Sequence, residues 1–336
     1  GLSLTVKGDL NNSTSNNKKY DNPEIGDGAT NGGRLTSYAY QYKTVTLQEI
    51  LSWNYQFNQV HNVEAMVAHE NYSWERKYTS GMNTGMAVDG NLTMGNFLNN
   101  SYFSGSDDED KTESYLARVK YNYDNRYFVE GSFRRDGSSR FGKNNRYATF
   151  PSFSLGWRLN REKFMQNLSW IDDLKVRGSW GQTGNQEISN IARYTIYVPN
   201  YGVTESGGQS YGTSYDIAGT NGGSILQSGF KRNQIGNDNI KWETTTQTNL
   251  GLDFSLFKQS LYGSFDWFYK KTTDILVQMA GIAAMGEGSS QWINAGEMKN
   301  VGVELNLGYR NQTRFGLKYD LNANISTYRN EITKLP

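Results

Sequence analysis

Few residues in this 336-residue chain have the side-chain chemistry that catalysis or metal binding requires. Cysteine is absent, and histidine occurs only as His61 and His69. A zinc site would need further ligands, such as Glu64 or Glu70, so we expect the two histidines to be interfacial or turn residues. No Gly-x-Ser-x-Gly sequence marks a nucleophilic serine, and no glycine-rich phosphate motif follows a strand and opens a helix. We predict no catalytic residue, no metal site and no cofactor, and a protein that is not an enzyme.

The acidic run Asp107-Asp108-Glu109-Asp110 has the ligand type that suits a hard cation. Calcium prefers carboxylate oxygens, but known calcium loops space their ligands and place a glycine between them. Because this run has neither feature, and because charge runs are usually exposed, we favour a solvated loop over a calcium site.

The segment Asp136-Gly137-Ser138-Ser139-Arg140 also has two interpretations. It could be a loop that contacts a ligand, or a tight hairpin turn. We favour the hairpin, because Asp, Gly and Ser are common turn residues and Gly tolerates positive φ.

The composition favours a barrel in a membrane. The chain has 34 basic and 33 acidic residues, which leaves no basic surplus for nucleic acid. Aromatic residues make up 14% of a chain whose mean hydropathy is −0.72. A membrane barrel has this mixture, because its outward face is apolar and aromatic while its interior and loops are polar. No run approaches the roughly 18 apolar residues of a transmembrane helix.

Apolar and polar residues alternate with a period of two along most of the chain. Leu250, Leu252 and Phe254, for example, alternate with Gly251 and Asp253. Because successive side chains of a strand point to opposite faces, each such segment has one apolar and one polar wall. We predict an all-β, antiparallel fold of about eleven strands; the clearest further segments are 115–123, 127–134, 153–159, 174–180, 261–270, 301–310 and 315–325.

Long and short connections alternate along the predicted strands. A transmembrane barrel has long extracellular loops and short periplasmic turns, whereas a β-sandwich has no reason to place every long loop at one end. Because bacterial barrels have even strand numbers, an odd count also predicts that this is an internal part of a larger barrel. We expect long loops near 10–35, 79–111, 137–146, 184–240 and 275–296, and short turns near 58–61, 124–126, 258–260 and 310–314, with 160–172 intermediate.

Several segments resemble the SusC/RagA family of TonB-linked outer-membrane proteins. They follow one another in the order that such proteins show and span most of residues 110–330, while residues 1–110 carry weaker signatures. The matching segments are 131–142 (GSFRRDGSSRFG), 150–158 (FPSFSLGWR), 174–186 (LKVRGSWGQTGNQ), 241–245 (KWETT) with 251–254 (GLDF), and 300–305 (NVGVEL).

The resemblance implies a roughly 22-stranded barrel closed by an N-terminal plug, in the outer membrane of a Gram-negative bacterium. Such proteins import oligosaccharides or peptides with energy from TonB, and commonly pair with a SusD-like lipoprotein. We expect residues 1–336 to be part of one barrel domain that contacts membrane lipid. On this reading the plug, the TonB-binding N-terminal region and the C-terminal strands lie outside this sequence.

Charged residues are predicted on the polar wall of the barrel. They could contact the plug or a polar substrate, or simply form the wet lining of the lumen, and we favour the lining and the plug contacts. These residues are Arg118, Lys120, Glu130, Arg134, Arg177, Asp266, Glu304 and Lys318.

The long segment 184–240 holds the candidates for substrate contact. It is rich in Gly, Ser, Thr and Asn, and its aromatic rings could stack on sugar rings. Packing on neighbouring loops or on a lipoprotein partner is an equal alternative. The candidates are Tyr194, Tyr197, Tyr201, Tyr211 and Tyr215.

Two alternatives to nutrient import remain at this point. A passive porin or an exporting barrel has the same periodicity. A surface-attached β-rich binding or adhesion module is the other, and it would need polar outward faces and loops of mixed length at both ends.

Overall fold

Eleven strands form one continuous antiparallel sheet, in which strands adjacent in this order are hydrogen-bonded neighbours. The computed structural model describes residues 1–199, 230–280 and 290–335. The all-β, antiparallel prediction and the strand number are confirmed. The sheet order is β1 (Leu2–Asp21), β2 (Arg34–Phe57), β3 (His61–Met86), β4 (Phe97–Tyr123), β5 (Tyr127–Ser138), β6 (Tyr147–Arg158), β7 (Ile171–Asn185), β10 (Glu243–Leu256), β11 (Leu261–Thr273), β14 (Glu297–Gln312) and β15 (Lys318–Lys334).

A second, four-stranded sheet lies within the connections between β7 and β10 and between β11 and β14. Its order is β12 (Leu276–Met279), β13 (Ser290–Asn294), β9 (Phe230–Ile235) and β8 (Ile196–Pro199). Among the described residues there are four short 3-10 helices: η1 (Gly26–Asn31), η2 (Met94–Asn96), η3 (Leu159–Arg161) and η4 (Lys163–Met165). Within the described residues, no helix has the length and apolar character to cross a membrane.

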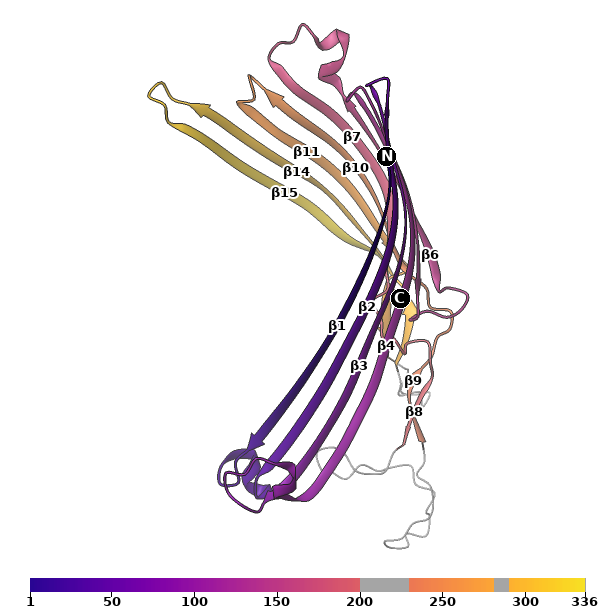
Figure 1. The fold of residues 1–336 in the computed structure, drawn as a ribbon, viewed down its shortest axis with the longest axis vertical. Coiled ribbons are helices and arrows are strands. Elements are labelled where there is room, and N and C mark those ends of the chain that lie inside the picture. Colours follow the sequence, from indigo (N-terminus) through magenta and orange to yellow (C-terminus); the bar gives the residue numbers. More distant parts are fainter. Residues whose placement is uncertain (200–229, 281–289, 336) are drawn as a thin grey trace.

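The connections sort to opposite ends of the large sheet, as predicted. Figure 1 shows the short turns together at the upper end and the long connections at the lower end. In two of the short turns, residues that tolerate a left-handed backbone take positive φ: Asn58 has a φ of 47°, and Asp124 and Asn125 have φ of 51° and 48°. We call these two ends the short-turn end and the long-loop end.

The long loops predicted near 10–35 and 79–111 are wrong in extent. β1 continues to Asp21, β3 continues to Met86 and β4 begins at Phe97, so only 22–33 and 87–96 remain as connections. The residues added to β1 are mostly polar on both faces, for example Asn11 and Asn12. Backbone pairing between the strands continues past the point where the hydrophobic alternation stops, so the alternation alone underestimates the strand length.

One face of the sheet carries an apolar band next to the short-turn end. The band covers residues 115–123 of β4, 261–269 of β11 and 301–309 of β14, at every second position. A tilted strand needs roughly 9–11 residues to cross a membrane, which is the length of this band. Aromatic rings line the edge of the band at the short-turn end, where Trp53 stacks on Tyr55 and Tyr123 stacks on Tyr127. Amphipathic rings occupy this position in the interfacial girdles of membrane barrels.

Candidate functional site

The predicted polar-wall charges all lie on one face of the eleven-stranded sheet, which we call the inner face. The register places Lys120 opposite Glu130 and Asp266 opposite Glu304. The register places the remaining charged residues on this same face; they are Arg118, Arg134, Arg177 and Lys318. The apolar band occupies the opposite, outer face. That the inner-face charges meet a plug or line a lumen stays a prediction.

Several inner-face charges pair with one another. The Arg177 guanidinium lies 3.2 Å from Asp253 and 2.7 Å from Asp266, so one cation holds carboxylates on two strands. Gly251 makes room for it, because a Cβ at this position would lie 2.6 Å from Arg177 Cζ. Lys120 and Glu130 are 3.9 Å apart. The resulting wall is polar but largely charge-balanced.

Two hollows follow the inner face. One, of about 760 Å³, is lined by residues that include Lys120, Glu130 and Lys175. The other, of about 700 Å³, includes Gln182 and Gln247 among its lining residues. Amides, hydroxyls and paired charges can hold a polar partner through many hydrogen bonds. This arrangement is suited to non-covalent binding.

A small hydrophobic core lies at the long-loop end of the sheet. Trp242 is 7% exposed, and its ring centroid lies 5.1 Å from that of Phe141 and 5.7 Å from that of Phe150. The Trp242 indole Nε1 donates to the carbonyl of Arg146 at 3.1 Å. The remaining buried members are Ile188, Ala192 and Ile240, with Ala148, Leu276 and Trp292 packed against them. Sequence reasoning noted these segments as motifs and missed that they converge.

Glycines within the same motifs permit this convergence. A Cβ on Gly142 would lie 2.3 Å from the carbonyl oxygen of Asp238, and a Cβ on Gly184 would lie 2.1 Å from the Phe150 ring. Both contacts are far below van der Waals distance. The loops can therefore close over the core only with glycine at these positions.

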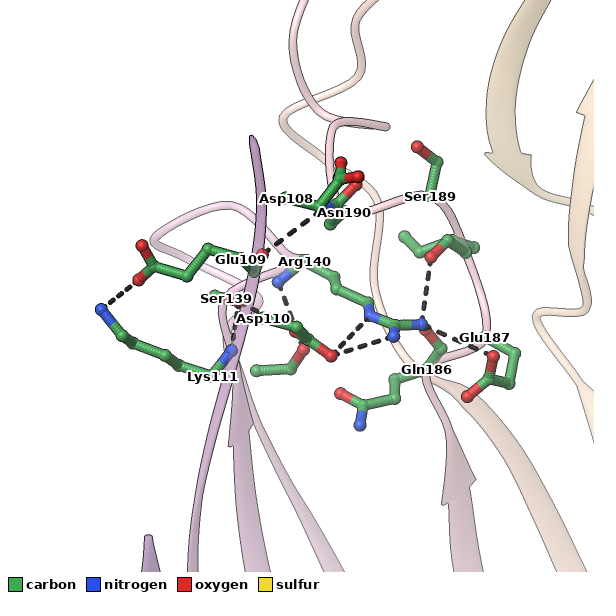
Figure 2. Close-up of polar contacts among 12 residues, drawn as sticks. Asp108, Glu109, Asp110, Lys111, Ser139, Arg140, Gln186, Glu187, Ser189 and Asn190 are labelled. Atoms are coloured by element: carbon green, nitrogen blue, oxygen red, sulfur yellow. Dashed lines mark hydrogen bonds and ion pairs between the residues drawn. The ribbon is translucent and has the colours of Figure 1, made fainter. Parts of the chain in front are cut away.

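The acidic run belongs to this loop end and is not a solvated loop, which corrects the expectation. Residues 107–110 lie in β4, and Asp110 is 5% exposed. Figure 2 shows the Arg140 guanidinium against Asp110, with Nη2 at 2.9 Å from its carboxylate. Ser139 Oγ donates to the same carboxylate at 3.0 Å. The buried charge is thus matched by a cation and a hydroxyl.

Arg140 also forms hydrogen bonds with the segment that follows β7. Its Nη1 donates to the carbonyls of Gln186 and Ile188 at 3.2 and 3.1 Å (Figure 2). Segment 136–140 is therefore structural, as favoured, but it is not a tight turn. β5 runs through Ser138, and the connection to β6 covers 139–146. The sequence could not show this, because the partners of Arg140 are distant in the chain.

The other acidic residues of the run also have partners. Asp108 pairs with Arg76, and Glu109 pairs with Lys111, whose pKa is raised by the hydrogen bond and charge of that carboxylate. Asn190 donates to the Glu109 carbonyl at 3.3 Å (Figure 2). In the part of the chain that the structure describes, no cluster of three or more His, Asp or Glu residues could hold a metal ion.

The candidate tyrosines are only partly described. Tyr194 and Tyr197 are exposed at the long-loop end, and the Arg193 guanidinium lies 4.3 Å from the Tyr194 ring centroid. Tyr201, Tyr211 and Tyr215 lie outside the described residues. Substrate contact by these residues stays a prediction.

The two histidines lie where the sequence suggested. His61 starts β3 at the short-turn end, with its ring stacked on Phe57 at 4.2 Å between centroids. His69 lies on the outer face, and its Nδ1 is 2.8 Å from Glu49. Neither contributes to a metal cluster among the described residues.

One aromatic feature of the inner face was missed. Tyr38, Tyr40 and Tyr42 of β2 lie beside Tyr78 of β3, and we call these four residues the tyrosine strip. They share the inner face with Arg118, because Arg118 pairs with Met66 and Tyr78 lies an even number of positions after Met66 along β3. Tyrosine at every second position from 38 to 42 was the available signal.

Comparison with known proteins gives consistent matches over the chain. Residues 1–335 match the family model described as TonB dependent receptor-like, beta-barrel. The chain is 35% identical over 225 residues to the TonB-dependent receptor SusC of Bacteroides thetaiotaomicron, which covers 66% of this chain and 21% of SusC. It is 32% identical over 315 residues to the TonB-dependent receptor P3 of Formosa agariphila, covering 92% of this chain and 29% of P3.

The fold matches a solved transporter. The structure of the RagAB peptide transporter superposes with a TM-score of 0.85 at 25% identity, over 100% of this chain and 35% of the matched chain. The ferric citrate transporter FecA shares the fold with a TM-score of 0.55 at 10% identity. The chain thus spans less than a third of the length of the curated relatives named above.

Proposed function

The chain belongs to the TonB-dependent receptor β-barrel family, and we therefore propose that it forms part of the wall of an outer-membrane nutrient importer. Proteins of this family are transport proteins and not enzymes, and they lie in the outer membrane of Gram-negative bacteria. The family match gives no support to the alternatives of an adhesion module or a passive porin.

One observation carries this proposal: a single sheet has two unlike faces, and its short turns gather at one end. The outer-face apolar band would contact lipid, because its length suits a tilted strand that crosses a bilayer. The inner face would contact water, a plug and a passing polar substrate. Arg177, with two carboxylate partners, is suited to such a polar lining.

The named relatives support a proposal for the substrate and the partners. RagAB is a peptide transporter, and SusC is a TonB-dependent receptor. We infer that the full-length protein imports oligosaccharides or peptides, that a SusD-like lipoprotein caps the long-loop end, and that TonB acts through a region outside this chain. The exposed Tyr194 and Tyr197 then lie at the end where the substrate enters.

Uptake by the intact organism tests the import proposal. We expect deletion of the full-length gene to abolish uptake of at least one fluorescently labelled oligosaccharide or peptide from a mixed panel. Deletion of TonB should abolish the same uptake, because the energy for import reaches the barrel through TonB. Uptake that persists without TonB would contradict the proposal. Returning the gene to the deletion strain with the substitutions Tyr194→Ala and Tyr197→Ala then tests the loop candidates.

Adjacent residues of β14 test which face meets lipid. Leu305 is on the outer face near the middle of the apolar band, opposite Phe265, while Asn306 is on the inner face, opposite Ser264. In the full-length protein, Leu305→Arg should cost about 2–4 kcal/mol of folding free energy, as a cation does at the bilayer midplane. Asn306→Arg should cost much less. The measurement is urea unfolding in lipid vesicles, followed by heat-modifiable migration; equal costs would contradict the assignment of the two faces.

A further inference from the structure

The tyrosine strip lies on a part of the wall that extends beyond the apolar band. On β4 the band ends at Tyr115, yet the strand continues back to Phe97, and β2 and β3 accompany it. Residues 97–114 extend about 60 Å along the strand at about 3.3 Å per residue. Figure 1 shows β1–β4 reaching beyond the other strands toward the long-loop end. This part of the inner face would lie at the outer mouth of the barrel.

Three rings of the strip, those of Tyr40, Tyr42 and Tyr78, lie next to one another. Tyr40 and Tyr78 lie directly opposite each other, with ring centroids 4.7 Å apart. Tyr40 and Tyr42 lie 6.1 Å apart with ring planes 5° from parallel. All four strip tyrosines are half-buried, so part of each ring stays accessible. Further along β3, Tyr72 and Trp74 continue the same face toward the membrane band.

Small side chains flank the strip on both sides. On β1, Ser13, Ser15 and Asn17 lie opposite Tyr42, Tyr40 and Tyr38. On β4, Ser106 lies opposite Tyr78. Because these neighbours are short, the rings stand above them as a ridge that an extended ligand could contact along its length.

The charges beside the strip are already paired. Arg76, opposite Tyr42, forms an ion pair with Asp108 on the inner face. Asp110 is paired with Arg140. Partial burial and the nearby phenols of Tyr78 and Tyr42 raise the pKa of Tyr40, so its hydroxyl stays protonated and able to donate. The surface thus offers aromatic rings and hydroxyls rather than an unmatched charge.

We propose that the tyrosine strip binds a neutral oligosaccharide at the outer mouth of the barrel. This rests on the proposed function and names the substrate class. A sugar ring has apolar C–H faces and hydroxyl edges, and tyrosine has the matching combination of an apolar ring and a polar tip.

A peptide fits this surface less well. Peptides are often held by strand addition at a free sheet edge or by unmatched charges. β2 pairs with β1 and β3, and β3 pairs with β2 and β4, so both strands of the strip have two occupied edges. The neighbouring charges are neutralised by each other, which disfavours an acidic glycan as well.

The test uses the full-length protein, purified in detergent with its lipoprotein partner. Isothermal titration measures the binding of maltohexaose, cellohexaose and xylohexaose, with trigalacturonate and a hexapeptide as contrasting probes. We expect at least one neutral sugar to bind, and the double variant Tyr40→Ala/Tyr78→Ala to bind it at least tenfold more weakly, equivalent to about 1.4 kcal/mol. Tyr40→Phe keeps the ring and should weaken binding less. Phe103 lies on the outer face of β4 and is 79% exposed, so Phe103→Ala should leave sugar binding unchanged.

Four results would overturn the assignment. These are no binding of any neutral sugar, preferred binding of the acidic or peptide probe, unchanged affinity in the double variant, or loss of the lipoprotein partner instead of the sugar. Heat-modifiable migration checks that each variant folds. If the double variant does not fold, Tyr40→Phe still tests the strip. TonB-dependent uptake is measured separately, so import can stand when the strip assignment fails.

Discussion

Arg140→Ala is expected to loosen the long-loop end of the sheet by about 3–5 kcal/mol. The substitution leaves the 5% exposed Asp110 without its cation, and breaking a buried pair from one side costs this much. It also removes the donors to the carbonyls of Gln186 and Ile188. The loss is local, because the strands on either side keep their backbone ladders.

Hydrogen exchange of the full-length protein measures this loss. Amides of 139–146 and 186–192 should exchange at least about a hundredfold faster, since each 1.4 kcal/mol is a factor of ten. Amides in the middle of β10 and β11 should not change. Lys111→Ala is the matched control, because Lys111 and Glu109 form a pair with both side chains more than half exposed, worth less than about 1 kcal/mol. Equal protection in Arg140→Ala and the wild type would show that the pair does not hold the loops.

Local periodicity was enough to predict the faces of the large sheet. Whether Leu305 and Glu304 lie on opposite faces depends only on strand geometry, and the register confirms that they do. Short turns also indicate which successive strands lie side by side, as for β4 and β5. The same reasoning failed where the chain is polar on both faces, as at Asp107 and Asp108 in β4. There β4 is extended by backbone pairing with β3, and this pairing produces no hydrophobic pattern in the sequence.

The loop end could not be predicted, because its contacts are between distant segments. In the second sheet, Ser290 of β13 pairs with Gln234 of β9 across the connection that contains β10 and β11. The partners of Arg140 and of Trp242 are likewise tens of residues away. Nothing in the local pattern around Asp110 distinguishes a buried, paired carboxylate from a solvated one. The sequence identified the segments of the site but not their meeting point.

Trp242→Ala should have an equally large effect on the same region, about 3–5 kcal/mol. The indole is almost fully buried between Phe141 and Phe150, and a truncated side chain would leave a cavity that glycine-rich neighbours cannot fill without moving. The hydrogen bond to the Arg146 carbonyl is lost as well. Trp242→Phe should cost less, because it keeps part of the aromatic contact. Trp170→Ala is the control, since that ring is 46% exposed at the short-turn end.

The second sheet should respond to Trp242→Ala, although Trp242 is not part of it. Leu276 at the start of β12 and Trp292 in β13 pack against the core that Trp242 completes. Faster exchange is therefore expected at 276–279 and 290–294 as well as at 139–146. If exchange rose only beside residue 242, the core would not be what joins the two sheets. Arg140 is the chain neighbour of Phe141, which belongs to the same core as Trp242. The double variant Arg140→Ala/Trp242→Ala should therefore lose less folding free energy than the two single variants added together. A fully additive cost would mean that the ion pair and the core hold the loops independently.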